Sequence, residues 1–473
     1  MWKSVNLVLN YILFFTLLGL VRSTVITNHT SDLGTTPFEY IIVGGGTTAL
    51  AVANRLAVNH SVLVVERGPD LVNDEVINDP FTKFGTGSCL GGSSSINTMI
   101  GSRPTFAGMS AVEALGNPGW GWNDFLPYMQ KSETFHPPNP TQHAEGADFI
   151  AVVHGFEGPV GVSFAQPLIA PTLQNAAKNT TNTVFEGEIA LSPDMGDGFS
   201  GGHYSSYYHH IHFNKTLQMD RRSSSAWSYL YPQAQQREGL TVLTGHRVNN
   251  VLTSIGAGGN ITATGVLIEP TGGGTTSTFN VSREVVLSAG TIYRSGIGNT
   301  PFLQSIGIEP VLDLPGVGAN FQDQILLTNV SFSLTPSANI TNVTGGGEVL
   351  LAVVVAHPTA TDTLGSSGTS AMDKMLRNIS AEHALSTNGI VTSETLTTQA
   401  ALIADAYQID HPLIEIFYTP GPTSINVWAQ SVLPLSRGTI RINTTDPSVD
   451  PIADAQYLTT EVDMVVAVPR LTC

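Results

Sequence analysis

The sequence predicts a mixed α/β protein, and three observations carry that prediction. The 473 residues are 41% hydrophobic, which is enough apolar material for a large core or for two domains of roughly 150 residues or more. A strand-like run at 40–43, a glycine turn, a helical segment at 50–57 and a second strand-like run at 61–65 have the order of a βαβ unit. Short strand-like runs separated by Gly/Thr turns between 240 and 290 predict a β-meander.

Charge and cysteine content exclude several classes of function. The chain has 20 basic and 37 acidic side chains, a formal charge of −17. Nucleic-acid phosphates and anionic membrane surfaces both require Lys and Arg, so neither partner is expected. The two cysteines, Cys89 and Cys473, cannot form a disulfide framework, and no Cys/His spacing indicates zinc. No metal site is therefore predicted.

The first 23 residues have the pattern of a secretory signal peptide. Lys3 precedes an apolar stretch at 11–21, and small residues before Ser23 suit a cleavage site there. A membrane anchor is the alternative, but the stretch is shorter than the ~20 residues that span a bilayer. Several Asn-x-Ser/Thr triplets agree with secretion as a glycoprotein; they include Asn28, Asn59, Asn179, Asn214, Asn329 and Asn443. We expect an extracellular protein without stable membrane insertion.

The C-terminal residues predict a helix that is cut short. Thr460 lies three residues before Asp463, which is typical of a capped helix start. Pro469 interrupts the segment and the chain stops at Cys473. This ending predicts a C-terminally shortened protein.

The glycine turn of the βαβ unit predicts a dinucleotide site. Gly44-x-Gly46-x-x-Ala49 follows a strand and opens a helix, whose N-terminal N–H groups suit a pyrophosphate. Gly44 permits the tight turn, and Gly46 allows the backbone to approach the phosphates. Glu66, at the end of the next strand, can accept hydrogen bonds from an adenosine ribose, which favours FAD or NAD over NADP.

A second glycine-rich segment runs from Leu90 to Asn97. Two glycines followed by three serines place N–H groups and hydroxyls at a helix start, an arrangement that binds anions. A Ser-rich helix cap is the alternative interpretation.

Together these motifs resemble a known family, the glucose–methanol–choline (GMC) oxidoreductases, and within it the fungal glucose-oxidase and aryl-alcohol-oxidase branch. The stretches that carry the resemblance, in order, are 41–46, 90–97, 117–122, 222–227, 240–245, 287–290, 295–298, 313–318 and 320–323. The resemblance implies a Rossmann-type FAD-binding domain at 36–165 and 238–330. It also implies an interleaved substrate domain on an antiparallel sheet at 166–237 and 331–473, after the signal peptide at 1–23.

The resemblance also implies the chemistry and its residues. The expected reaction is oxidation of the CH–OH group of an alcohol or sugar, with hydride transfer to flavin N5. The implied cofactor contacts are Gly44, Gly46, Thr47 and Thr48 at the pyrophosphate, Glu66 at the adenosine ribose, Ser93 and Asn97 along the flavin side, and Val248 at adenine.

The catalytic base is the point at which this chain departs from the family. Hydride transfer requires a group that takes the hydroxyl proton, and histidine suits this role. The family places that histidine near its C-terminus, whereas this sequence has none after His411. Glu415 resembles the carboxylate that orients the missing histidine, although it could be an acidic residue on an edge strand. Phe417 and Trp428 match positions near the substrate pocket.

Several interpretations stay open. His210 and His212 share a strand face, but no third ligand has recognisable spacing for a metal. The rivals to an active alcohol oxidoreductase are an FAD-binding non-redox cyclase of secondary metabolism, a non-catalytic remnant and an NAD-dependent dehydrogenase. The sequence specifies neither the alcohol nor the electron acceptor. The oligomeric state is open, with a homodimer among the options.

Overall fold

The computed structural model describes residues 24–74, 87–166, 168, 170–231, 237–289, 293–335, 353–379, 392–409, 411–420 and 423–467, with the side chains of 328 and 329 excepted. The predicted signal peptide at 1–23 and the residues from 468 onward lie outside the described residues. The chain packs as two compact units. Unit 1 holds the described residues of 1–70, 88–92 and 225–289, and unit 2 holds the others.

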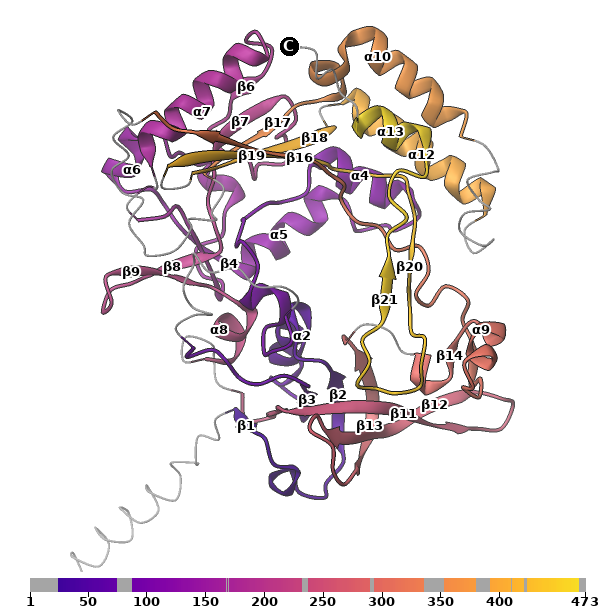
Figure 1. The fold of residues 1–473 in the computed structure, drawn as a ribbon. Coiled ribbons are helices and arrows are strands. Elements are labelled where there is room, and N and C mark those ends of the chain that lie inside the picture. Colours follow the sequence, from indigo (N-terminus) through magenta and orange to yellow (C-terminus); the bar gives the residue numbers. More distant parts are fainter. Residues whose placement is uncertain are drawn as a thin grey trace, which may run out of the picture. The chain divides into compact units, whose positions relative to one another are not determined.

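Unit 1 is built on a seven-stranded sheet (Figure 1). Its spatial order is β1 (Val25–Thr27), β10 (Leu240–Leu243), β3 (Val62–Val65), β2 (Phe38–Val43), β13 (Ser277–Leu287), β12 (Ile261–Pro270) and β11 (His246–Ile255). The first five strands pair in parallel, and β13, β12 and β11 pair antiparallel. Helices α2 (Thr47–Leu56) and α8 (Ser225–Leu230) contact each other in this unit.

The parallel part forms because its strands are apolar along their whole length. All four residues of β3 are buried, as are Ile41 and Ile42 of β2, which is the pattern of strands covered on both faces. Helix α2 buries Ala49, Leu50 and Ala53 on one side. The predicted β2–α2–β3 unit is confirmed, and its helix begins at Thr47.

The predicted meander is only partly correct. Strands β11, β12 and β13 form it, but β10 pairs with β3 in parallel instead. The far end of β13 leaves β12 and pairs with β2 in parallel. Leu240, Val242 and Leu243 are fully buried, and burial on this scale is available in the centre of the parallel sheet.

Unit 2 contains a six-stranded sheet. Its order is β16 (Leu326–Ser333), β19 (Ser424–Ser431), β18 (Ile414–Pro420), β17 (Val354–His357), β7 (His203–Ser206) and β6 (Ala190–Leu191). All neighbours are antiparallel except β6 and β7. The antiparallel sheet expected for the substrate domain is therefore present, and the mixed α/β fold class is confirmed.

Four helices accompany this sheet: α7 (Pro171–Val184), α10 (Ala360–Arg377), α12 (Ser393–Gln408) and the shorter α13 (Glu461–Ala467). Leu173 and Ala177 of α7 pack with Val354 and Tyr418 of the sheet. Figure 1 shows α10 and α12 side by side, and both share a second core cluster with α13. The predicted helix start at Thr460 is confirmed, because its hydroxyl accepts a 3.1 Å hydrogen bond from the Asp463 N–H.

Unit 2 contains further helices and short strands outside this sheet. They are α4 (Phe106–Ala114), α5 (Trp122–Ser132), β4 (Glu133–His136), α6 (Pro140–Ala144), β5 (Val160–Ser163), β8 (Ile211–Asn214), β9 (Met219–Arg222), β14 (Ile297–Gly298), α9 (Thr300–Ser305), β15 (Leu312–Asp313), β20 (Thr439–Arg441) and β21 (Ile452–Asp454). The two units differ from the expected domain boundaries. The described residues of 71–87, 93–165 and 290–330 belong to unit 2, although they were expected in the cofactor domain, and those of 225–237 belong to unit 1, although they were expected in the substrate domain. No helix in the described part of the chain is both long and apolar enough to cross a membrane.

Candidate functional site

The glycine turn between β2 and α2 can be made only with glycine at its first position. Gly44 has φ +93°, and its N–H donates to the Val65 carbonyl at 2.8 Å. A Cβ atom here would lie 2.7 Å from the Ser288 carbonyl oxygen and 2.9 Å from the Ala289 side chain. The turn is thus pressed against the end of β13, and any larger residue would push the two apart.

The helix that follows presents its N-terminus without a side-chain cap. Gly46 is the N-cap and has no side chain to bond the first N–H groups, which carry partial positive charge. Thr47 and Thr48, the first two helical residues, are exposed. Thr47 is held on both sides, because its Oγ1 donates to the Gly91 carbonyl at 3.2 Å and its own carbonyl accepts from Ser225 Oγ at 2.6 Å.

The second glycine segment lies directly against this turn. The Gly91 N–H donates to the Gly45 carbonyl at 2.9 Å, and Gly92 has φ +53°. A Cβ on Gly92 would lie 2.9 Å from the Gly46 Cα. Two segments that are more than forty residues apart in sequence therefore line one backbone cradle that side chains would fill.

The carboxylate of Glu66 holds the glycine turn of the cradle in place through hydrogen bonds. It is 6% exposed, its Oε2 accepts from the Gly45 N–H and its Oε1 from the Gly68 N–H, both at 2.7 Å. Burial raises the pKa of Glu66, against the two backbone hydrogen bonds that lower it. Each oxygen retains a second lone pair, so the carboxylate can still accept from a ribose hydroxyl. Bracing the turn is a role that the sequence did not reveal.

The predicted adenine contact, Val248, lies two residues along β11 from a residue that is hydrogen-bonded to Glu66. The His246 N–H donates to the Glu66 carbonyl at 3.1 Å, and Val248 follows two residues later on β11. Six predicted cofactor residues thus share unit 1: Gly44, Gly46, Thr47, Thr48, Glu66 and Val248. The glycine cradle, the uncapped helix and the acceptor at Glu66 together fit an adenine dinucleotide. The individual contacts stay predictions.

The other two predicted cofactor residues, Ser93 and Asn97, belong to unit 2. They lie at the short 3₁₀ turn η2 (Gly92–Ser95), where the Asn97 N–H donates to the Ser93 carbonyl at 2.9 Å. Arg222 Nη1 donates to Asn97 Oδ1 at 2.9 Å and to its carbonyl at 2.7 Å. Arg222 is 1% exposed, so this buried guanidinium fixes the Asn97 side chain. Sequence reasoning did not identify that role.

Glu415 lies on one face of the six-stranded sheet, which we call the Glu415 face. Strand pairing places Glu415 opposite Gln430, and Phe417 opposite both Val355 and Trp428. Since side chains alternate along a strand, Phe417 and Glu415 point to the same side. Tyr207 and Met195 pack with Phe417 on this face, and Trp428 is packed against the same cluster. Aromatic and polar groups are thus adjacent on this face. That Phe417 and Trp428 lie near a substrate pocket stays a prediction.

The carboxylate of Glu415 has a histidine partner. His357 Nε2 lies 2.9 Å from Glu415 Oε1, and Gln430 Nε2 donates to Oε2 at 2.9 Å. On its other nitrogen, His357 Nδ1 lies 2.8 Å from Ser200 Oγ. Strand β18 is interior to the sheet, so the edge-strand interpretation of Glu415 is wrong. Sequence reasoning missed His357, which comes 58 residues earlier and meets Glu415 only through strand pairing.

His210 and His212 do not lie on one strand, because β8 begins at Ile211. No group of three or more metal-binding side chains occurs among the residues that the structure describes. His212 Nδ1 lies 3.1 Å from Ser223 Oγ, and burial lowers the pKa of His212 to about 4. The residue is therefore neutral at pH 7.

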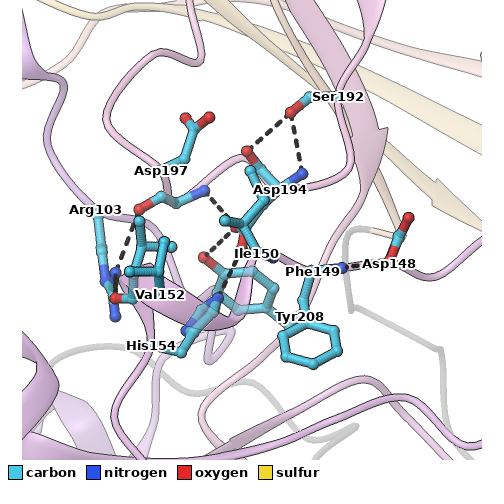
Figure 2. A network of polar contacts seen from close by, with 12 residues as sticks. Arg103, Asp148, Phe149, Ile150, Val152, His154, Ser192, Asp194, Asp197 and Tyr208 are labelled. Carbon is cyan, nitrogen blue, oxygen red and sulfur yellow. Dashed lines mark hydrogen bonds and ion pairs between the residues drawn. The ribbon is translucent and has the colours of Figure 1, made fainter.

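A separate buried ionic network surrounds His154. Its Nδ1 lies 3.0 Å from Glu133 Oε1 and its Nε2 lies 2.8 Å from Asp194 Oδ2, and Arg103 Nη2 pairs with Glu133 Oε1. Figure 2 shows part of the network, with Tyr208 beside the His154–Asp194 pair. Burial lowers the pKa of His154, but the hydrogen bonds to the two carboxylates outweigh it and raise the pKa. The ring is held as an imidazolium that joins three segments.

Comparison with known proteins agrees with this arrangement. Residues 38–326 match the family model described as GMC oxidoreductase. The chain is 32% identical to the glucose oxidase-like protein fsoC of Humicola fuscoatra, over 90% of this chain and 76% of that protein. It is 29% identical to glucose oxidase 2 of Penicillium expansum, over 94% of this chain and 76% of that protein.

Solved structures show the same fold. An FAD-dependent oxidoreductase from Chaetomium thermophilum superposes with a TM-score of 0.76 at 25% identity, covering 91% of this chain and 80% of that one. A fungal aryl-alcohol oxidase superposes with a TM-score of 0.76 at 23% identity, covering 91% and 81%. The family match over most of the chain and the fit of the glycine cradle lead to one conclusion. This chain belongs to the GMC oxidoreductase family, and its cofactor is FAD.

Proposed function

We propose that this chain oxidises the CH–OH group of a small alcohol or sugar with FAD as the hydride acceptor. The observation that carries the proposal is the backbone cradle in unit 1. Two glycine segments lie against each other there, and Glu66 accepts a hydrogen bond from one of them. FAD, when bound, supplies the redox chemistry by accepting a hydride at flavin N5. Penicillium glucose oxidases and an alcohol oxidase of Pichia angusta are among the relatives, which supports this donor class.

The residues of unit 1 would bind the cofactor. Gly44 and Gly46 allow the backbone to approach the pyrophosphate, and the α2 N-terminus with Thr47 and Thr48 offers N–H and hydroxyl donors. Glu66 would accept a hydrogen bond from the ribose. In unit 2, Ser93 and Asn97 would lie along the flavin side, with Asn97 already oriented by Arg222.

The Glu415 face suits an organic alcohol. Its aromatic part, with Phe417 and Trp428, would contact the carbon skeleton, and its polar part can hydrogen-bond a hydroxyl. An alcohol that gives up a hydride must also give up its hydroxyl proton. Glu415 is the carboxylate that supports the proton acceptor in this proposal, and the imidazole that it contacts in this structure is His357.

Anaerobic reduction tests the proposal. Purified protein loaded with FAD is mixed with a panel of primary and secondary alcohols and sugars without oxygen, and the yellow absorbance of oxidised flavin is followed. Bleaching by an alcohol is the expected result. Conversion of a substrate while the flavin stays oxidised would point to the cyclase instead, and no bleaching by any donor would contradict the proposal.

We also propose that the protein is exported and glycosylated. Four of the named Asn-x-Ser/Thr sites, Asn28, Asn59, Asn179 and Asn443, are exposed. Expression in a fungal host should give secreted protein that begins close after Ser23 and that loses mass on treatment with an endoglycosidase. Retention of the whole chain inside the cell, with residues 1–23 still attached, would contradict this proposal.

A further inference from the structure

Ser200 occupies an unusual turn next to the Glu415 face. It is the serine of Gly198-Phe199-Ser200-Gly201-Gly202, which fits the G-x-S-x-G pattern of serine nucleophiles. Gly198 has φ +93° and Gly202 has φ +72°. A Cβ on Gly198 would lie 2.8 Å from the Trp122 ring. The positive φ at Gly198 and Gly202 favours glycine at both positions. The segment leads into strand β7 and not into a helix, so the inference depends on the side-chain contacts of Ser200 and not on the motif alone.

The hydroxyl of Ser200 begins a chain of hydrogen bonds with a defined direction. An ionised carboxylate can only accept, so Glu415 Oε1 fixes a proton on His357 Nε2. Nδ1 of His357 is then the basic nitrogen, and the Ser200 hydroxyl donates to it at 2.8 Å. Serine, base and orienting carboxylate within hydrogen-bond reach are the three parts of an activated nucleophile.

Backbone hydrogen bonds and strand pairing fix the positions of His357 and of the segment that carries Ser200. The Gly202 N–H donates to the His357 carbonyl at 2.8 Å, and His203 pairs with His357 across β7 and β17. Glu415 is fixed in turn by Gln430. His357 and Glu415 are therefore each positioned by strand pairing or by a second hydrogen bond, as a preorganised site requires.

A candidate donor for a developing oxyanion follows Ser200 in the sequence. In serine hydrolases with this motif, the N–H of the residue after the nucleophile stabilises the oxyanion. Here that residue is Gly201, whose N–H makes no hydrogen bond within the described part of the chain.

Burial limits what could reach the serine. Ser200 is 2% exposed, whereas the preceding Phe199 is 53% exposed and stacks on Phe106 at 5.5 Å. Because so little of the serine is accessible, we restrict the expected substrates to acyl groups of acetyl size.

We propose that Ser200, His357 and Glu415 form a nucleophilic site that takes short-chain acyl esters, independently of FAD. Ser200 Oγ bonds to the ester carbonyl carbon while its proton moves to His357 Nδ1. The bond from that carbon to the leaving oxygen then breaks, and the leaving group receives the proton. Water repeats the sequence on the acyl-serine and releases the carboxylic acid. Glu415 is the positioning residue.

Acyl trapping with p-nitrophenyl acetate tests this proposal on the full chain, with and without FAD. The expected result is a burst of p-nitrophenolate and an acetyl group that peptide mass spectrometry locates on Ser200. Ser200→Ala should abolish that acetylation, and His357→Gln should slow it by about 10²-fold or more, the usual contribution of a positioned base. p-Nitrophenyl hexanoate should react far more slowly than the acetate.

The control is Ser205→Ala, which removes a buried hydroxyl of β7 that donates to the Ser192 carbonyl; acetylation of Ser200 should be unchanged. Wild-type protein whose Ser200 stays unmodified would overturn the proposal, as would His357→Gln protein that is acetylated at the wild-type rate. Because the wild-type chain carries the decisive readout, misfolding of a variant does not obscure it. Flavin binding and bleaching are measured separately, so the two proposals can fail independently.

Discussion

At the scale of single residues, the cofactor site depends on two glycines that have no Cβ atom. Gly44 lacks the Cβ that would meet Ser288, and Gly92 lacks the one that would meet Gly46. A substitution at such a position changes the backbone that a pyrophosphate must approach. The carboxylate of Glu66 also fixes the turn, because it accepts hydrogen bonds from the Gly45 and Gly68 N–H groups.

Replacing Gly44 with alanine should cost both stability and FAD affinity. The matched control is Gly34→Ala, because Gly34 has φ +67° but no atom within 4 Å of its Cβ position. Gly34 has ψ −168°, a backbone conformation that is essentially restricted to glycine, so the control should lose about 1–3 kcal/mol from the backbone alone. Gly44→Ala should lose more in urea unfolding of the apoprotein and should bind FAD at least tenfold more weakly. Equal effects of the two substitutions would show that the close contact is unimportant.

Glu66→Gln tests the brace under the turn. Glutamine keeps the shape but places an NH₂ group where one carboxylate oxygen accepts a backbone N–H. Losing a hydrogen bond to a charged acceptor should lower the free energy of unfolding by about 1.5–3 kcal/mol. FAD affinity, measured by fluorescence quenching on titration, should fall as well. Unchanged stability would contradict the bracing role, and unchanged affinity would contradict the ribose contact.

At the scale of elements, the His154 network links β4, the segment before β5 and the turn around Asp194. Two carboxylates, one imidazolium and the Arg103 guanidinium balance in charge. Such a cluster contributes stability only while every member holds its charge. Its pKa shifts therefore translate into a pH range for the stability of unit 2.

The sign of each shift fixes that range. The raised pKa of His154 gives stability that is complete below the usual 6.5 and is lost as the pH rises through the folded value. The lowered pKa values of Glu133 and Asp194 give stability that is complete above 4.5 and 3.8 and is lost on acidification. The network should thus stabilise the fold most between pH 4.5 and 6.5.

The His154→Gln variant checks this prediction. Its urea midpoint should be lowered most within that range and should vary less above pH 6.5 than the wild-type midpoint does. The exposed His143→Gln is the control, with the wild-type pH profile expected. A His154→Gln profile parallel to that of the wild type above pH 6.5 would show that the imidazolium does not contribute.

Local patterns predicted the elements well but not the pairings across long stretches of sequence. The βαβ unit follows from apolar runs and a glycine turn within about 25 residues, and the structure has it at 38–65. The pairing of β10 with β3 and the meeting of Glu415 with His357 depend on strand order, which no short window contains. A serine nucleophile was not predicted from the sequence, although Gly198-x-Ser200-x-Gly202 matches the Gly-x-Ser-x-Gly pattern. Its partners His357 and Glu415 meet it only in the folded chain.

At the scale of the whole molecule, the two units separate the predicted tasks. Unit 1 carries the dinucleotide cradle and unit 2 carries the Glu415 face. Family membership and the cofactor follow from motifs spread over residues 38–326. Donor identity does not, because the side chains of the Glu415 face meet only after the sheet has formed.

FAD should stabilise the folded chain by mass action. A ligand at a hundredfold excess over its Kd adds about 2.7 kcal/mol to the free energy of unfolding. Thermal unfolding with increasing FAD should therefore shift steadily upward, and Gly44→Ala should lose most of that shift. NAD at the same concentrations should leave the unfolding temperature unchanged; a shift with NAD alone would favour the dehydrogenase.

Visible absorbance of the purified chain after incubation with FAD and removal of free cofactor tests the central claim most directly. The account predicts a stoichiometric yellow flavoprotein whose colour depends on the glycine cradle. A folded protein that stays colourless after this treatment would contradict it.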